Sequence, residues 1–333
     1  MINSVRKIKI EQHSWPMAKE FRISRSTRTE TKVVKLSIIQ DQFTGSAEVV
    51  PQPRYNESIE SVTHQIKELS NEIEKGLSIE ELQNKLTAGA ARNAIDCALW
   101  DLKAKLENKS VAQLNGLKEF GGCITAQTIS LDTINKMAEE AVLYKDYPLI
   151  KIKLNNEQVI EKIKAIHQAA PNSQFIVDAN EAWNIDELNQ FAPHLKNCNA
   201  VLIEQPLKEK DDQALQNYTG SVMLCADESI HTSHQINRIS KLYGCINIKL
   251  DKTGGLTESL NLLNAAREHN LSVMVGCMVG SSLAMAPASL VSSYADFVDL
   301  DGPELLASDV KFGFNYKNGL MSSLNRKLWG FPT

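Results

Sequence analysis

Short apolar runs recur along the chain from about residue 122 onward, and helical segments separate most of them. The runs are CITAQTI, LIKIKL, FIVDAN, AVLIEQP, MLCADES, CINIKLD, LSVMVGC and FVDLD. Eight strand-like runs at a spacing of about 20 to 30 residues predict an α/β fold of the (β/α)8 barrel type. A doubly wound open sheet is the alternative, but the glycine-rich phosphate fingerprint that often marks it is missing. KTGGL lacks Walker spacing, so we interpret it as a turn.

The first hundred residues follow a different pattern. SVRKIKIEQHSW and TKVVKLSIIQDQF alternate as antiparallel strands do, whereas ESIESVTHQIKELSNEIEKG and ARNAIDCALWDLKAKLENK have helical periodicity. The last thirty residues resume the antiparallel-like pattern. We therefore expect an α+β capping domain at 1–118, a barrel at 119–303 and a C-terminal segment at 304–333 that returns to the cap.

Composition excludes several classes of protein. The formal net charge of -4 argues against a nucleic-acid or anionic-membrane surface. The N-terminus has no apolar h-region, and no run approaches the roughly 18 apolar residues of a membrane span. Six cysteines without a CxxC pair predict reduced core residues of a cytoplasmic protein. A small-molecule partner is expected, and a homo-oligomer stays open.

Polar residues stand at the ends of the predicted strands. They are Lys151 with Lys153, Asp178, Glu204, Asp227, Lys249 with Asp251, and Asp299 with Asp301. Strands of a barrel end at one face, so these side chains should converge there. Taken singly, Asp178 or Asp227 could cap a helix, and the two lysines of LIKIK could belong to an edge strand with one face in water. The set as a whole favours a functional site.

The three carboxylates of Asp178, Glu204 and Asp227 would repel one another in a dry site, which makes a cation between them the expected arrangement. Oxygen ligands without His or Cys favour a hard ion such as Mg²⁺ over zinc. The zinc-like alternative, His231 and His234 in HTSH, lacks accompanying ligands. We interpret HTSH as a solvated loop or helix start.

The lysines suit acid–base chemistry beside such a metal. A free lysine has a pKa of about 10.4, and a nearby metal and a second lysine both disfavour its charged form. Lys153 and Lys249 lie on well-separated strands and could flank a substrate from opposite faces. This arrangement predicts a 1,1-proton transfer, in which one lysine removes a proton, the metal holds the enolate and the other lysine returns a proton.

These motifs resemble the enolase superfamily, in its muconate-lactonizing branch. The KxK of the second strand, the Asp/Glu/Asp of strands three to five and the KxD of the sixth match that branch, whose lysine and Mg²⁺ chemistry is well known. AGAARNAIDCALWDL, IVDANE, EQPL, LCADES and NIKLDKTGGLTE look like the dipeptide epimerases within it. The resemblance implies a modified TIM barrel of (β/α)7β type with a cap, and one Mg²⁺ per subunit. It also implies that Lys153 and Lys249 are catalysts, and that Lys151 and Asp251 belong to the substrate-binding set and tune or orient the two catalysts.

The same resemblance implies a set of substrate contacts. Asp299 and Asp301 match a DxD motif that holds the α-amine of a dipeptide, and Thr128 matches a substrate-contacting threonine. FRISRSTRTE resembles a specificity loop of the cap, where Arg28 would pair with a glutamate side chain, with Arg22 and Arg25 as alternatives. PRYNES resembles a second cap loop.

Cys277 and Met278 would orient the substrate from the segment GCMVGSS. Many members of the branch carry an acidic residue shortly after this methionine, whereas Gly280 and Ser281 have no charge.

The expected function is Mg²⁺-dependent epimerisation of a dipeptide at its C-terminal residue, interconverting L-Ala-L-Glu and L-Ala-D-Glu in cell-wall peptide metabolism. An o-succinylbenzoate synthase or N-acylamino acid racemase on the same fold is the alternative, and Asp299 and Asp301 speak against it because those substrates have no ammonium group. A catalytically silent barrel is a third hypothesis, which the intact set of lysines and carboxylates opposes.

Overall fold

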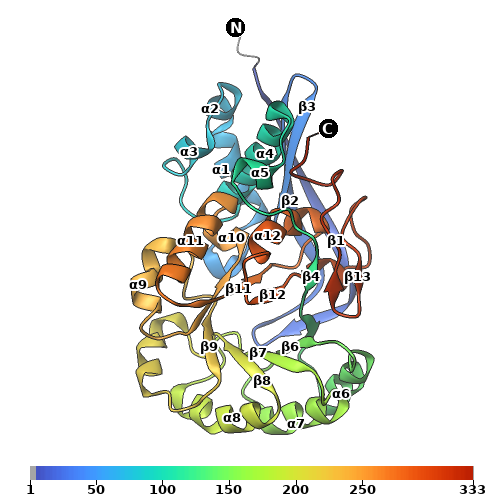
Figure 1. Ribbon diagram of the computed structural model, residues 1–333, viewed down its shortest axis with the longest axis vertical. Helices are drawn as coiled ribbons and strands as arrows, with labels where there is room; N and C mark the ends of the chain where they lie inside the picture. The colour runs from blue at the N-terminus through green and yellow to red at the C-terminus, as the bar shows by residue number, and fades with distance from the viewer. Residues whose placement is uncertain (1–4, 333) are drawn as a thin grey trace.

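The computed structural model describes residues 5–332 and has a cap above a barrel (Figure 1). The cap is built on an antiparallel sheet with the strand order β1-β2-β3. These strands span Lys7–Ile23, Ser26–Gln40 and Phe43–Val49. Because side chains alternate along a strand, Val34, Leu36 and Ile38 share one face of β2 and are fully buried in the core.

Helices cover this sheet on one side. They are α1 (Ile59–Glu68), α2 (Ser70–Glu74), α3 (Ile79–Leu82), α4 (Ala90–Glu107) and α5 (Val111–Leu114). α4 packs so closely on β3 that a Cβ atom added at Gly45 would lie 2.1 Å from the carbonyl oxygen of Ala98. Glycine at position 45 therefore sets the distance between helix and sheet.

Eight parallel strands form the lower body, in the order of the chain from β5 to β12. They are β5 (Gln127–Ile129), β6 (Leu149–Lys153), β7 (Gln174–Asp178), β8 (Ala200–Glu204), β9 (Met223–Ala226), β10 (Cys245–Ile248), β11 (Ser272–Gly276) and β12 (Phe297–Asp299). The amide of Ala126, before β5, donates to the carbonyl oxygen of Val298 on β12 at 2.8 Å, so the sheet curls until its ends meet. This sequential order confirms the predicted barrel and excludes the doubly wound alternative.

Helical segments follow the first seven barrel strands. They are α6 (Ile134–Leu143), α7 (Val159–Ala169), α8 (Ile185–Asn197), η2 (Glu209–Asn217), η3 (Ser233–Gln235) with α9 (Ile236–Ile239), α10 (Leu250–Thr253) with α11 (Leu256–Glu268), and α12 (Ser282–Ser292). After β12 comes only the short 3₁₀ helix η4 (Gly302–Leu305), which gives the (β/α)7β pattern.

The barrel interior has two layers because inward-facing residues recur at every second position. One layer is an apolar cluster of Ala126, Leu149, Ile176, Leu202, Cys225, Cys245 and Met274. At the next inward positions come Lys151, Asp178, Glu204 and Asp227, with Asn247 on β10, and Lys153 and Lys249 lie two residues further along their segments. The six cysteines are free thiols, and four of them are buried.

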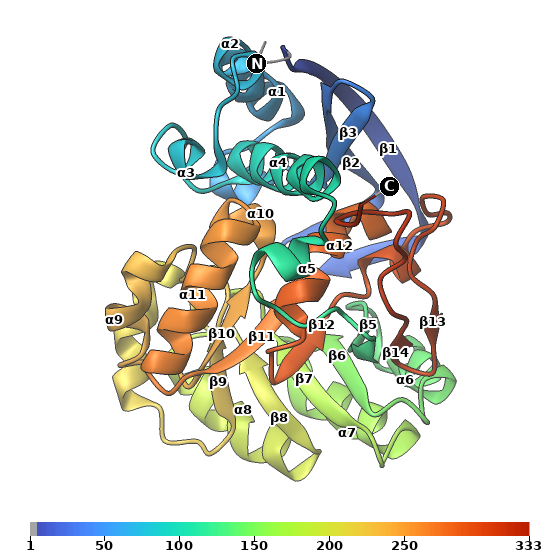
Figure 2. The ribbon, with the colours of Figure 1, turned by 45° about the horizontal axis from the view of Figure 1, so that its top comes forward.

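The C-terminal residues run back along the outside of the molecule. β13 (Tyr316–Lys317) and β14 (Leu320–Met321) form a small antiparallel sheet with β4 (Cys123–Ile124). Beyond them, the indole N–H of Trp329 donates to the carbonyl oxygen of Cys97 on α4 at 3.2 Å. Figure 2 shows this segment beside the cap, and the β1–β2 hairpin reaching down to the barrel.

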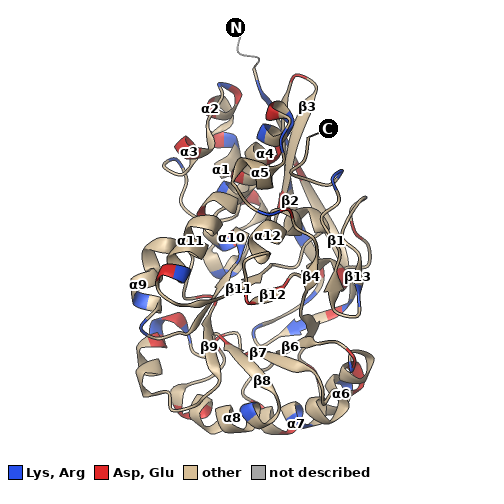
Figure 3. Cartoon of the chain, in the orientation of Figure 1, with Lys and Arg blue, Asp and Glu red and all other residues tan. Residues whose placement is uncertain are grey.

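Charged residues of both signs are interspersed over the outer helices (Figure 3). Within residues 5–332, no helix combines the length and the apolar character needed to cross a bilayer.

Candidate active site

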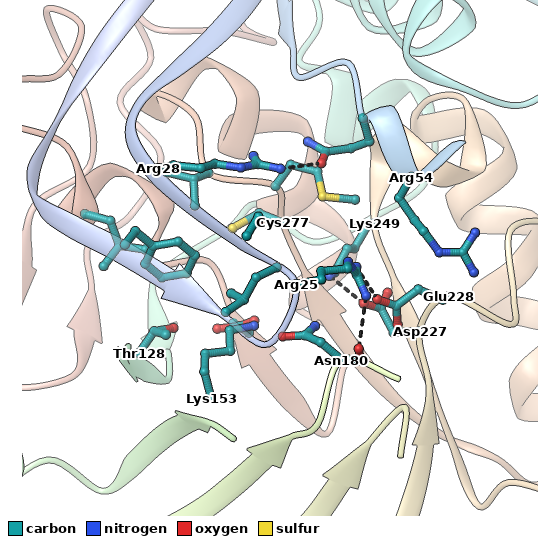
Figure 4. Close-up of a pocket in the computed structure, with 18 of the residues that line it drawn as sticks. Arg25, Arg28, Arg54, Thr128, Lys153, Asn180, Asp227, Glu228, Lys249 and Cys277 are labelled. Atoms are coloured by element: carbon teal, nitrogen blue, oxygen red, sulfur yellow. Dashed lines mark hydrogen bonds and ion pairs between the residues drawn. The ribbon is translucent and has the colours of Figure 1, made fainter. Parts of the chain in front are cut away.

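A cavity of about 550 Å³ lies between the cap and the ends of the barrel strands (Figure 4). Its cap side is formed by the tip of the β1–β2 hairpin and by residues 52–55, which include η1 (Pro53–Tyr55). Its barrel side is lined by Thr128, Lys151, Lys153, Asn180, Asp227, Glu228, Lys249, Cys277, Met278, Val279, Asp299 and Asp301.

Both lysines of β6 point into the barrel. β6 pairs with β5 on one side and β7 on the other, and Lys151 and Lys153 are only 1% and 8% exposed, so the edge-strand interpretation is wrong. Lys151 Nζ lies 2.6 Å from Glu204 Oε2 and 2.6 Å from Asp299 Oδ2. Lys153 Nζ donates to Asp178 Oδ2 at 2.5 Å.

Lys249 directly follows β10 and reaches the cavity from another side than Lys153 (Figure 4). Its Nζ donates to Asp227 Oδ2 at 2.7 Å and lies 3.9 Å from Glu204 Oε1. The two lysines thus belong to strands that are four positions apart in the barrel order.

The three carboxylates expected to bind a metal come from successive strands. Asp178 and Glu204 are register partners at the ends of β7 and β8, and Asp227 follows β9. All three are at most 2% exposed. Glu204 Oε2 and Asp227 Oδ1 have no hydrogen bond of acceptable geometry, although lysine nitrogens lie 2.6 Å away. Such oxygens remain available as ligands.

Within residues 5–332, no three Asp, Glu, His or Cys side chains stand ready as a coordinating group. Lysines bridge the carboxylates instead: Lys151 spans Glu204 and Asp178, and Lys249 spans Asp227 and Glu204. The donor set still fits a hard cation, because it consists of buried carboxylates with orphaned oxygens. His231, the zinc-like alternative, instead packs edge-on against Tyr55 with ring centroids 4.7 Å apart.

The pKa values in this lysine–carboxylate network differ from the expectation that the charged form of each lysine would be disfavoured. Burial alone would lower the pKa of Lys249, but the charges of Asp227 and Glu204 outweigh it and raise that pKa. The pKa of Lys151 is likewise raised, by Asp299, Glu204 and Asp178 against burial. Burial and the neighbouring Asp178 raise the pKa of Glu204 to about 8. Lys151 and Lys249 are therefore ammonium ions in this arrangement, and positive charge bound by the same carboxylates would lower the pKa of both.

The three candidate arginines have different partners. Arg22 pairs with Glu20 on the surface of the hairpin. Arg25 Nη2 lies 2.6 Å from Glu228 Oε1, which is buried beside the cavity. Arg28 lines the cavity, and its Nη2 donates to the side-chain amide oxygen of Gln52 at 3.2 Å. Arg28 is therefore the arginine of the three that is best placed to pair with a ligand anion.

Asp299 and Asp301 both line the cavity near Thr128. Asp301 Oδ2 accepts the backbone N–H of Thr128 at 2.7 Å, and the side chain of this threonine also hydrogen-bonds to Asp301. Asp299 Oδ1 is buried without a hydrogen-bond partner, although its other oxygen contacts Lys151. A carboxylate in the cavity lining that has one oxygen without a hydrogen bond is suited to a ligand ammonium group.

Cys277 and Met278 line the cavity as expected, and the cap holds their segment in place. The carbonyl oxygen of Val279 accepts from Thr31 Oγ1 at 2.9 Å. Where Gly280 and Ser281 lack charge, β3 supplies one: Glu48 Oε1 accepts the Ser281 amide at 2.7 Å.

Asp251 is not in the cavity lining, and its expected substrate contact needs correction. β10 ends at Ile248 and α10 begins at Leu250, so Lys249 directly follows the strand and Asp251 lies on the helical turn after it. Its Oδ1 accepts from Asn93 Nδ2 at 2.9 Å and from the Val50 amide at 3.2 Å, both in the cap.

Helix α4 also forms hydrogen bonds with residues that follow Asp251. Arg92 Nη2 donates to the carbonyl oxygen of Thr253 at 2.6 Å, and Asp96 Oδ1 accepts from Thr257 Oγ1 at 2.6 Å. The role of Asp251 is thus to join cap and barrel.

Sequence reasoning missed Lys252, which lies in the segment interpreted as a turn. Its side chain is fully buried, 2.6 Å from Asp227 Oδ1, and donates to the carbonyl oxygens of Ile230 and Asn247 at 3.1 Å. A lysine three residues after Lys249 on a helical turn was the available signal. Glu181, which pairs with Arg25 and Arg54, was also missed, and no periodic pattern could have revealed it.

Comparison with known proteins agrees with this geometry. The mandelate racemase/muconate lactonizing enzyme N-terminal domain matches residues 5–116, and the enolase C-terminal domain-like family matches residues 133–323. An N-acetyl-D-glutamate racemase of a Pseudoalteromonas species is 47% identical over 90% of this chain and 95% of its own. The L-Ala-D/L-Glu epimerase of Escherichia coli strain K12 is 41% identical over 95% of this chain and 99% of its own.

One solved structure is of an enolase family member from Agrobacterium tumefaciens with homology to dipeptide epimerases, with bound sodium and L-Ala-L-Glu. It is 42% identical, covers 98% of this chain and 100% of its own, and superposes with a TM-score of 0.95. From these matches over nearly its whole length, the chain belongs to the enolase superfamily, in its mandelate racemase and muconate lactonizing enzyme family.

Proposed function

We propose that this protein is an isomerase that epimerises a dipeptide at its C-terminal residue and interconverts L-Ala-L-Glu and L-Ala-D-Glu. One observation carries the proposal: two buried lysines, Lys153 and Lys249, enter one cavity from separate sides (Figure 4). The relatives named for L-Ala-D/L-Glu epimerase activity and for bound L-Ala-L-Glu support the same reaction.

The reaction moves one proton at each face of a single carbon. The α-carbon of the substrate lies between the lysines, and one of them, as a neutral amine, takes the α-proton as the C–H bond breaks. The other, as an ammonium ion, gives a proton to the opposite face as the new C–H bond forms. Asp178 and Asp227, hydrogen-bonded to Lys153 and Lys249, fix the position of each Nζ.

Asp178, Glu204 and Asp227 would hold one Mg²⁺ per chain. When bound, it supplies positive charge where the substrate carboxylate gains negative charge. Lys151, between Glu204 and Asp299, adds a fixed positive charge beside the same carboxylates.

Two charged groups select the substrate in this proposal. Arg28, which has no carboxylate partner among residues 5–332, pairs with the side-chain carboxylate of the glutamate residue. The free oxygen of Asp299, with Asp301 beside it, accepts the α-ammonium group of the dipeptide. Both ends of Ala-Glu thus meet an opposite charge.

Racemisation of an N-acylated glutamate is the second candidate. It is favoured by the relative at 47% identity, which is named an N-acetyl-D-glutamate racemase. The substrate would share the glutamate end and the two-lysine chemistry but lacks an ammonium group for Asp299 and Asp301. We rank it second because it would leave Asp299 Oδ1 without a hydrogen-bond donor from the substrate.

The proposed setting is the turnover of cell-wall peptides in the cytoplasm, which is the source of Ala-Glu. The free thiols support a reducing compartment.

Proton NMR in D₂O with Mg²⁺ tests the proposal directly. With L-Ala-L-Glu, the glutamate α-proton signal should disappear while signals of L-Ala-D-Glu grow. Exchange with N-acetylglutamate alone would establish the second candidate. If neither substrate exchanges in protein shown to bind Mg²⁺, both candidates are wrong. The variant Lys153→Met/Lys249→Met is the control for enzyme-independent exchange.

A further inference from the structure

A second pocket of about 510 Å³ lies beside the active-site cavity and opens outward. Its lining consists of Ser24, Arg25, Arg54, Asn180, Glu181, Ala182, Lys208, Glu209 and Lys210. Three of these residues, Arg25, Arg54 and Asn180, also line the active-site cavity. They therefore form the wall between the two spaces.

Glu181 holds that wall together from the barrel side. Arg54 of η1 donates through Nε and Nη2 to the two oxygens of Glu181, each at 2.8 Å, which is a bidentate pair. Arg25 at the hairpin turn donates to Glu181 Oε2 at 3.3 Å. One carboxylate of the barrel thus binds an arginine from each of the two cap segments over the site.

The backbone around Glu181 is fixed in an uncommon conformation. Asn180 and Glu181 have φ angles of 45° and 67°, in the left-handed region that non-glycine residues seldom adopt. The amide of Glu181 donates to the carbonyl oxygen of Gln205 at 2.9 Å, and that of Asn180 to Asp178 Oδ1 at 2.9 Å. The carbonyl oxygen of Asn180 accepts from Arg25 Nη1 at 3.2 Å. This turn presents Glu181 to the cap.

We propose that Glu181 is a positioning residue whose ion pairs with Arg25 and Arg54 keep the wall closed, and that the outer pocket is the passage for substrate and product when those pairs separate. Both arginine side chains are 36% exposed. Ion pairs of partly exposed arginines are screened by salt, so these pairs can break and re-form in every turnover. The passage role rests on the proposed function, whereas the closure itself does not.

Limited trypsin digestion without substrate tests the closure, with cleavage after Arg25, Arg28 and Arg54 followed by mass spectrometry. Glu181→Gln keeps the shape of the side chain and removes its charge. We expect its cap segments to be cut about three to ten times faster than those of the wild type, the combined effect of several weak pairs. Added NaCl should speed cleavage of the wild type but not of the variant.

Glu209→Gln is the matched control. Glu209 lies in the same pocket, but its carboxylate is 3.9 Å from Arg54 Nη2, and it should leave the cleavage rate near that of the wild type. Arg54→Gln breaks the same pair from the cap and also removes one trypsin site, so its cleavage is followed after Arg25 and Arg28. At these two sites the double variant Glu181→Gln/Arg54→Gln should be cut no faster than the faster single variant. The closure is refuted if both single variants are cleaved at the same rate as the wild type at every salt concentration.

Kinetics with L-Ala-L-Glu test the passage. In Glu181→Gln, KM should rise about three- to tenfold while kcat changes less than about twofold, because the lysines and carboxylates are untouched. A fall in kcat at unchanged KM overturns the passage role. If Glu181→Gln is cleaved faster than the wild type but the wild type epimerises no dipeptide, the proposed function is refuted and the closure stands. If the protein epimerises the dipeptide but Glu181→Gln is cleaved at the wild-type rate, the proposed function stands and the closure is refuted.

Discussion

Arg28 donates a hydrogen bond to the side-chain amide of Gln52 at 3.2 Å, and no carboxylate of residues 5–332 pairs with its guanidinium group. Burial, and then the charge of Arg25, lower the pKa of Arg28. Arg28 is a half-buried cation that faces a cavity without an anion, so it is suited to bind a ligand carboxylate.

Replacing Arg28 by Met should therefore change substrate preference more than catalytic power. We expect kcat/KM for L-Ala-L-Glu to fall about 10- to 100-fold, the effect of a lost charge-assisted contact, while L-Ala-L-Met is affected much less. Arg22→Met is the control, because Arg22 pairs with Glu20 on the surface. An equal loss on both dipeptides would contradict the assignment of Arg28 to the glutamate side chain.

Single replacement of either lysine should separate the two halves of the reaction. Lys153→Ala and Lys249→Ala should each lower epimerisation by about 10²- to 10⁴-fold, the usual contribution of a general acid or base. Each variant should still exchange the α-proton of one diastereomer with D₂O, and the two variants should exchange opposite diastereomers. NMR of L-Ala-L-Glu and L-Ala-D-Glu in parallel measures this, and exchange of the same diastereomer by both variants would rule out the two-face arrangement.

The acidity of Asp301 predicts a pH dependence that differs between substrates. Burial and the charge of Asp299 raise the pKa of Asp301 from 3.8 to about 7, so Asp301 is neutral below that pH and ionised above it. The ratio of kcat/KM for L-Ala-L-Glu to that for N-acetylglutamate should therefore rise with pH through about 7 and level off above it. Asp301→Asn should flatten this ratio, because the amide does not ionise. A flat ratio in the wild type would show that Asp301 does not meet the ammonium group.

Lys252 should matter for stability as well as for the position of Asp227. Replacement by Met leaves Asp227 Oδ1 and the carbonyl oxygens of Ile230 and Asn247 without their donor. Removing one partner of a buried pair costs about 3–5 kcal/mol. Urea denaturation of Lys252→Met, with the exposed Lys241→Met as control, should show this loss, and calorimetry should show weaker Mg²⁺ binding. Equal stability of the two variants would mean that Lys252 is dispensable.

Gly45 provides a test of the cap that is independent of function. Alanine at this position places its Cβ 2.1 Å from Ala98 O and 2.5 Å from the Leu102 amide, so α4 or β3 must move. We expect a loss of about 1–3 kcal/mol or more in unfolding free energy. Gly121→Ala, where a Cβ meets no atom within 4 Å, should be near neutral. Thermal unfolding of both variants decides the matter.

Most of what could be predicted from the sequence about the fold and the site followed from the periodicity of the strands. Lys151 and Lys153 share the inward face of β6 because they are two residues apart, and Asp178 and Glu204 end neighbouring strands in register. These relationships follow from a period of two and from the parallel order of the barrel, both of which are local and repetitive. The order of the strands was predictable for the same reason.

Other features depend on where an element ends or on contacts between distant segments. Asp251 was placed with Lys249 because the strand was assumed to continue, whereas β10 stops at Ile248. Such boundaries are the least certain part of any sequence pattern. The pairing of Glu181 with Arg25 and Arg54 joins segments more than 100 residues apart, and nothing local in the sequence encodes it.

The hydrogen bonds between α4 and residues 251–257 bear on how this enzyme could be re-engineered. Asn93, Arg92 and Asp96 of the cap hydrogen-bond to Asp251, Thr253 and Thr257 of the barrel, a few residues after Lys249. A chimera that receives a whole cap from a relative would lose these hydrogen bonds unless residues 251–257 were exchanged together with the cap. The tip of the β1–β2 hairpin shares none of them, so grafting that tip alone is the practical unit for altering substrate preference.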